Sequence, residues 1–106
     1  MDYSFNKQAD HFQLSLTGSF TFNDNNKFRE IVGLMQDGTP QSLTLDLSQL
    51  EFIDSAALGM LLLLNDEAQK LGTNLCLTSA EGQIKKMLQL SNFDQIFTIN
   101  YTANDA

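Results

Sequence analysis

The sequence feature that most limits the possible folds is an apolar run, Ala56 to Leu64, that follows a strand-like segment. A helix packed on one face of a sheet needs only a stripe of apolar residues, yet this run is apolar on every side. It is also far shorter than the roughly 20 residues that a membrane-spanning helix requires. We therefore expect a helix packed on a sheet, which ends at about Leu71 with Gly72 as its C-cap.

The expected helix has more apolar residues than one sheet-facing stripe can hold. The residues of the stripe recur at helical spacing: Ala57, Met60, Leu61, Leu64, Ala68 and Leu71. This leaves Leu58, Leu62 and Leu63 near the rim of the sheet or in solvent. Exposed leucines are typical of a docking surface, but a third helix or a homodimer contact would equally well cover them. Both explanations stay open.

Asp54 and Ser55 stand directly before the apolar run, where the helix begins. Both residue types are ordinary N-capping residues, so the pair is explained by helix capping alone. However, a serine at a helix start lies beside unpaired backbone N–H groups and the positive end of the helix dipole. A phosphate on Ser55 would be stabilised there, which makes this serine a candidate phosphorylation switch.

In the N-terminal part, the pattern predicts a hairpin followed by a helix. Phe12 to Leu16 alternates apolar and polar residues, and we expect a strand that Gly18 interrupts, with residues 3–5 as its partner and a turn at residues 8–11. The helix is indicated by a set of apolar residues between two groups of boundary residues: Phe28, Ile31, Val32 and Met35, behind Asn23 and Asp24 and before Gly38 and Pro40.

Strands alternate with helices in the rest of the chain. The expected elements are a strand at residues 43–47, a loop at 48–53, a strand at 75–78, a helix around 84–90 and a closing strand or short helix at 93–99. We therefore expect one α/β domain over residues 1–106, in which helices pack on a mixed sheet with a parallel centre and an N-terminal antiparallel hairpin at its edge. We expect residues 102–106 to form a frayed tail.

The charge and composition narrow the choice of partners. A formal charge of −7, with six scattered Lys and Arg, leaves no basic stripe for nucleic acid or an anionic membrane. The acidic balance suits a basic protein surface, but it also serves solubility. One cysteine, Cys76, excludes an internal disulfide and is expected to be a small buried side chain. Because no signal peptide or membrane span is apparent, we expect a soluble, cytoplasmic protein without membrane insertion.

Nothing in the sequence predicts catalysis. The single histidine, His11, falls in the expected hairpin turn, far along the chain from Asp54 and Ser55, so a Ser-His-Asp triad is not expected. No second histidine and no further cysteine accompany it to bind a metal. The glycines lack the spacing of a nucleotide-binding loop. We therefore expect no enzymatic activity, no cofactor and no metal.

With these residues in view, the chain resembles the STAS domain, the fold of the anti-sigma factor antagonists of bacterial partner-switching systems. The most specific part of the resemblance is residues 45–59, Leu-Asp-Leu-Ser-Gln-Leu-Glu-Phe-Ile-Asp-Ser-Ala-Ala-Leu-Gly. Weaker likenesses are the Gly-Ser-Phe turn at residues 18–20 and the closing segment at residues 88–97. The resemblance covers nearly the whole chain.

The resemblance implies that a partner anti-sigma factor kinase phosphorylates Ser55 and that a serine phosphatase reverses this step. It also implies that Asp54 helps to orient the serine or supports contacts at the switch. Unphosphorylated protein would bind the kinase and release its sigma factor. Two departures stand out: Ala56 replaces a common Ser or Thr, and Thr21 replaces a common Asp, so Asp24 is the candidate for that acidic contact. The expected switch and partner-binding residues are Asp54, Ala56, Leu58, Gly59, Leu62, Leu63, Thr21 and Asp24.

A second function is compatible with the same resemblance. The domain could be a constitutive STAS subunit of a transporter or of a stressosome-like complex. Such a subunit would keep its partner whether or not Ser55 carried a phosphate, and this difference separates the two functions experimentally.

Overall fold

The computed structural model describes residues 1–100 and contains one five-stranded sheet. Its elements follow one another as β1 (Asp2–Gln8), β2 (His11–Phe20), the short 3-10 helix η1 (Phe22–Asp24), α1 (Asn25–Gly38), β3 (Ser42–Ile53), α2 (Ser55–Leu71), β4 (Asn74–Thr78), α3 (Gly82–Leu90), the 3-10 helix η2 (Phe93–Gln95) and β5 (Thr98–Asn100). The expected frayed tail, residues 102–106, lies outside the described residues.

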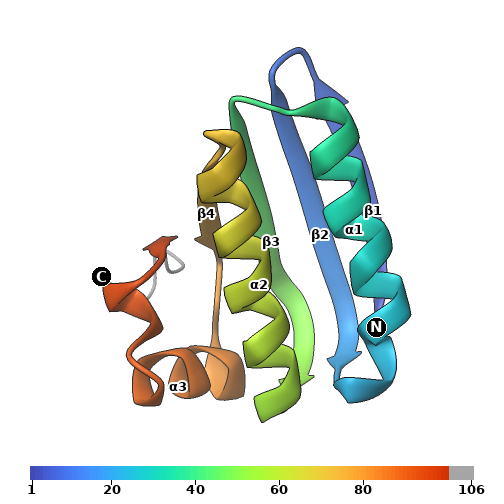
Figure 1. The fold of residues 1–106 in the computed structure, drawn as a ribbon. Helices are drawn as coiled ribbons and strands as arrows, with labels where there is room; N and C mark the ends of the chain where they lie inside the picture. The colour runs from blue at the N-terminus through green and yellow to red at the C-terminus, as the bar shows by residue number, and fades with distance from the viewer. Residues whose placement is uncertain (101–106) are drawn as a thin grey trace.

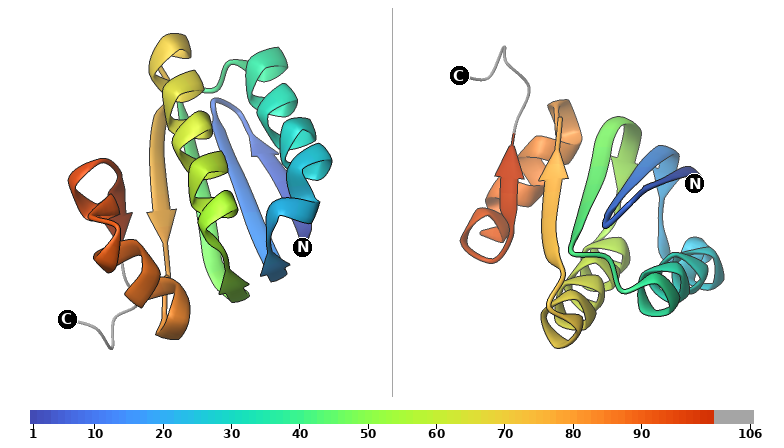
Figure 2. Two further views of the ribbon diagram at one scale, coloured as in Figure 1. Left: turned by 60° about the horizontal axis from the view of Figure 1, so that its bottom comes forward. Right: turned by 90° about the horizontal axis from the view of Figure 1, so that it is seen from above.

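The sheet is mixed, with the strand order β1-β2-β3-β4-β5. The hairpin β1–β2 is antiparallel, and each further neighbour pair is parallel. The helices α1 and α2 lie side by side across one face of the sheet, and α3 packs near the end of β3 (Figures 1 and 2). This arrangement confirms the predicted fold class, including the antiparallel hairpin at the edge.

A single apolar core lies between the sheet and these helices. Along β3, the side chains of Leu43, Leu45 and Leu47 are buried, whereas Thr44 and Asp46 between them are half-exposed. This alternation follows from the strand geometry, which turns successive side chains to opposite faces. Among residues 1–100, no helix has both the length and the apolar character needed to cross a membrane.

The predicted loop at residues 48–53 is wrong, because these residues continue β3. They pair with β2 as far as Ile53, which lies opposite Phe20. Two register shifts in this pairing insert extra residues into β3, as β-bulges do. After Leu47 the next buried residues are Leu50 and Ile53, at a spacing of three. Because of the bulges, apolar and polar residues no longer alternate in this segment. This alternation is the pattern by which a strand is recognised in a sequence.

The predicted position of His11 is also wrong. The hairpin turn consists of residues 9 and 10, and His11 is the first residue of β2, where it is half-buried. Its Nδ1 lies 2.6 Å from the hydroxyl oxygen of Ser42, and its Nε2 lies 3.3 Å from that of Thr44. Because Ser42 begins β3 and Ile53 ends it, His11 lies at the opposite end of that strand from Asp54.

Cys76 lies in β4 and is half-buried, so the expectation of a buried side chain is met only in part. Burial raises the pKa of its thiol, although a hydrogen bond to Asn100 acts in the opposite direction. A higher pKa lowers the thiolate fraction at neutral pH, and the thiolate is the reactive form. Cys76 is therefore not activated by its surroundings.

Candidate functional site

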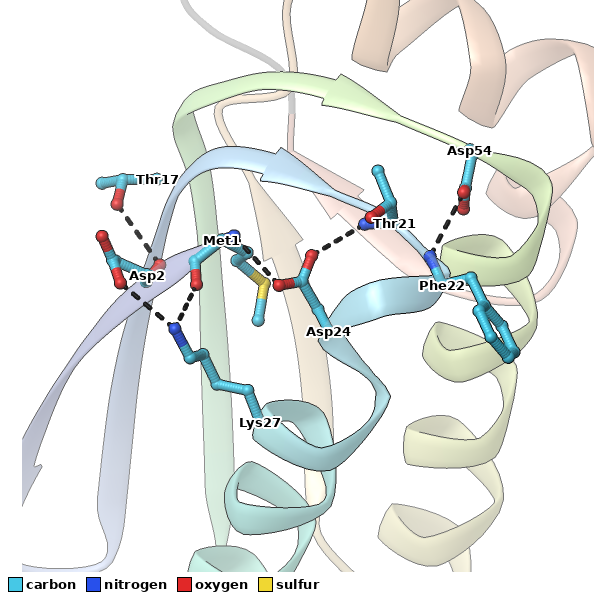
Figure 3. Close-up of polar contacts among 8 residues, drawn as sticks. All are labelled: Met1, Asp2, Thr17, Thr21, Phe22, Asp24, Lys27 and Asp54. Atoms are coloured by element: carbon cyan, nitrogen blue, oxygen red, sulfur yellow. Dashed lines mark hydrogen bonds and ion pairs between the residues drawn. The ribbon is translucent and has the colours of Figure 1, made fainter.

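Asp54 caps α2 and also fixes the turn between β2 and α1. Its backbone is extended, and its Oδ1 accepts a hydrogen bond of 2.8 Å from the N–H of Ala57. Its Oδ2 accepts one of 3.2 Å from the N–H of Phe22 (Figure 3). Its own N–H donates to the carbonyl of Phe20 at 3.2 Å. One carboxylate therefore holds the start of α2 against η1, which fixes the position of Ser55.

Ser55 is the first residue of α2, and it is exposed. In this position its hydroxyl is accessible from solvent, and N–H groups of the first helical turn lie beside it. The helix dipole favours negative charge at this end of α2, so an anionic group placed here would be stabilised in the unbound protein. Ala56, which follows, is half-buried and offers no second acceptor hydroxyl.

The end of β3 is tied to α3 by Gln83, a residue that the sequence did not single out. The N–H of Ile53 donates to Gln83 Oε1 at 3.3 Å, and Gln83 Nε2 donates to the carbonyl of Ile53 at 3.4 Å. The amide takes the place of a neighbouring strand on the β4 side of β3, where the pairing with β4 ends at Asp46. No local pattern marks such a glutamine, because its role depends on how α3 is placed.

The exposed face of α2 begins at Ser55 and continues through Gly59 to Leu62 and Leu63. Residues three and four positions apart lie on the same side of a helix, so these four form one continuous surface. Leu62 is 37% exposed and Leu63 is 54% exposed, in agreement with their expected position outside the sheet-facing stripe. We refer to these four residues as the α2 face.

The expectation for Leu58 is wrong, since this side chain is only 8% exposed and belongs to the core. Leu58 lies three residues before Leu61, so it borders the sheet-facing stripe. Met60, at the opposite edge of the stripe, is buried as expected. The buried arc of α2 is therefore wider than one stripe, and Leu58 packs inside the domain rather than on a docking surface.

The other acidic candidate, Asp24, lies in the η1 turn and has both carboxylate oxygens occupied. Oδ2 accepts from the N–H of Thr21 at 2.9 Å, and Oδ1 forms an ion pair of 3.0 Å with the amino group of Met1. Lys27 adds a hydrogen bond of 2.8 Å to the carbonyl of Met1 (Figure 3). These contacts favour a structural role for Asp24 in holding the turn that Asp54 also binds.

The contacts of Asp24 lower the pKa of its carboxyl group. Burial alone would raise this pKa, but the N–H of Thr21, the amino group of Met1 and the charge of Lys27 together outweigh that effect. A carboxyl group with a lowered pKa in the folded state stabilises the protein above its unfolded pKa of about 3.9. This stabilisation is lost as the pH falls through that value and the lower folded pKa.

We therefore expect Asp24→Asn to lower the free energy of unfolding at pH 7 by about 1–2 kcal/mol. The variant should also lose part of the drop in melting temperature that the wild type shows below about pH 4. Melting curves between pH 2.5 and 7 measure both effects. The control is Asp10→Asn, which changes an exposed carboxylate in the hairpin turn. Equal behaviour of the two variants would contradict the structural role of Asp24.

Other candidate sites lie away from Ser55. Among residues 1–100, no group of three or more His, Cys, Asp and Glu side chains is arranged to hold a metal ion. A shallow apolar cavity of about 190 Å³ lies between the hairpin and the end of α1, lined by Phe5, Lys7, Phe12, Leu34, Asp37 and Gly38. It is smaller than the roughly 300–1,000 Å³ of typical ligand pockets.

Comparison with known proteins identifies the family. A sequence model of the STAS domain matches residues 3–106. A STAS-domain-containing protein from Pseudomonas aeruginosa (strain UCBPP-PA14) is 34% identical over 87 residues, which make up 82% of this chain and 85% of the relative.

Solved structures share the fold. An anti-sigma factor antagonist from Mycobacterium paratuberculosis matches with a TM-score of 0.84 and 18% identity, over 98% of this chain and 88% of the other. The unphosphorylated anti-sigma factor antagonist SpoIIAA of Bacillus matches with a TM-score of 0.73 and 13% identity, over 98% and 92% of the two chains. At these identities the structural matches show a common fold, and the family follows from the sequence matches. The chain belongs to the STAS domain family.

Proposed function

We propose that this STAS domain is an anti-sigma factor antagonist, which binds an anti-sigma factor kinase while Ser55 is unphosphorylated and is released when Ser55 carries a phosphate. The observation that carries the proposal is the position of Ser55, exposed at the start of α2 and on the same side of the helix as Leu62 and Leu63. A modification at Ser55 therefore changes the charge of the surface on which exposed leucines offer apolar contact. SpoIIAA, which shares the fold and has also been solved in its phosphorylated form, supports this assignment.

The proposed switch works by charge. A phosphoserine adds about −1.5 to −2 charges at neutral pH. In the free protein the N-terminus of α2 stabilises this charge. In a closely packed complex, the phosphate would be desolvated beside Asp54, the residue that precedes Ser55. Phosphorylation thus costs more in the complex than in the free protein, and the complex dissociates.

In this proposal the protein is a substrate of a kinase and a phosphatase and not itself an enzyme. An attack by Ser55 on a substrate would need a base within hydrogen-bond distance. The only histidine, His11, lies at the other end of β3. The function also requires no metal, no cofactor and no nucleic acid, and the proposed partners act in the bacterial cytoplasm.

We expect incubation with the cognate kinase and ATP to add one phosphate, at Ser55. Intact-mass measurement gives the number of phosphates, and peptide mass spectrometry gives the position. Ser55→Ala is the control, because it removes the acceptor at an exposed position without affecting the cap that Asp54 provides. Phosphate on another serine, with Ser55 unmodified, would refute the assignment.

A further inference from the structure

Gly59 lies inside α2, where a glycine is unfavourable. In a helix interior, glycine costs about 0.5–1 kcal/mol relative to alanine, because its backbone loses more conformational freedom on folding. A Cβ atom added at Gly59 would have no heavy atom within 4 Å apart from the helix itself and its chain neighbours. The residue is also exposed. The fold of this domain therefore gives no reason for a glycine at this position.

Two other glycines show what such a reason looks like. A Cβ atom at Gly38 would overlap the ring of Phe12, so that the close packing of α1 on β2 requires a glycine. Gly72 caps α2 with a φ of +72°, a conformation that other residues adopt only under strain. Gly59 has neither the close neighbour nor the positive φ, and the same holds for Gly33 in α1. The two differ in that Gly59 lies on the α2 face.

The position of Gly59 points to a contact outside the chain. It lies one helical turn after Ser55 and about one turn before Leu62 and Leu63, and so at the centre of the α2 face. We infer that Gly59 is the point of closest approach for the backbone of the partner, so that a helix or extended segment of the anti-sigma factor kinase crosses α2 there. This inference rests on the proposed function and adds the shape of the contact to it.

The charge of the chain indicates the chemistry of that segment. The chain as a whole carries a formal charge of −7. On α2, exposed Asp66 lies one turn after Leu62 and Leu63, and exposed Lys70, one turn further on, is paired with Glu67. A complementary segment is basic and has a small residue over Gly59. A second copy of this chain fits less well, because two acidic chains repel each other.

The test compares Gly59→Ala with Gly33→Ala. Gly33 is likewise inside a helix, α1, and a Cβ atom there also has open space around it. We expect both variants to melt about 3–8 °C higher than the wild type, because alanine is the better helix former. Only Gly59→Ala should bind the purified kinase that phosphorylates Ser55 more weakly, by at least tenfold. Gly59→Gln, with a larger side chain, should bind it more weakly still.

The outcomes distinguish the close approach at Gly59 from the proposed function. If the wild type binds the kinase and Gly59→Ala binds equally well, the close approach is refuted while the proposed function stands. Equal weakening by Gly33→Ala would also refute it, since the loss would then follow from a stiffer helix rather than from the added methyl group. If the wild type does not bind the kinase at all, both fail. Sedimentation velocity identifies the remaining case, a homodimer that Gly59→Ala disrupts, which would contradict the inferred occupant.

Discussion

Leu61→Asp should unfold the domain, whereas Leu63→Asp should leave it folded and abolish binding to the kinase. Leu61 is fully buried between α2 and the sheet, and Leu63 is 54% exposed. An unpaired carboxylate in the core costs several kcal/mol, a large part of the 5–15 kcal/mol that stabilises a typical domain. At Leu63 the carboxylate stays in water, so we expect the melting temperature to change by only about 2–3 °C.

The same samples are used for thermal melting and for a binding assay with the purified kinase. Leu62→Asp extends the comparison, because Leu62 is also on the α2 face, with 37% exposure. A melting temperature of Leu63→Asp as low as that of Leu61→Asp would show that Leu63 supports the fold. A folded Leu63→Asp variant that binds the kinase like the wild type would place the docking surface elsewhere.

The second large effect is expected at the switch itself. Ser55→Ala should keep the affinity of the wild type within a factor of about three, whereas Ser55→Asp should weaken binding at least tenfold. Phosphorylated protein, with its larger charge, should bind about a hundredfold more weakly, which corresponds to roughly 3 kcal/mol. Titration calorimetry of the three forms against the kinase gives these affinities.

A matched control distinguishes charge at the switch from charge in general. Ser4 is exposed on the edge strand β1, so Ser4→Asp adds the same charge far from α2 in the chain. It should bind the kinase like the wild type. Equal affinities for Ser55→Ala and Ser55→Asp would instead favour a constitutive STAS subunit of a larger complex, whose attachment does not depend on Ser55.

Both ends of α2 could be predicted because their signals are local. The side chain of Asp54 reaches an N–H three residues away, and Gly72 adopts the positive φ at the helix end. The alternation of buried and half-exposed residues in β3 up to Leu47 is also a local signal. Such features need only the neighbouring sequence, and for that reason the positions of Asp54 and Ser55 at the start of α2 followed directly from it.

The features that could not be predicted depend on neighbours far along the chain. The burial of Leu58 is set by the width of the packed arc around α2, which no spacing rule contains. The contact of Gln83 with Ile53 joins residues 30 positions apart. The half-buried environment of His11 comes from Ser42 and Thr44 on the adjacent strand. In each case the tertiary arrangement, rather than the local pattern, decides the surroundings of the residue.

The bulges of β3 bear on how this protein can change during evolution. They lie between Asp46 and Phe52, and they bring Ile53 at the end of the strand into register with Phe20 of β2. Loss or gain of one residue in this stretch would turn the following side chains to the opposite face of the sheet. Ile53 would then lose its register with Phe20, and Asp54 would lose the N–H of Phe22 that it binds. The length of this segment therefore matters more for the attachment of the start of α2 than the identity of its exposed side chains.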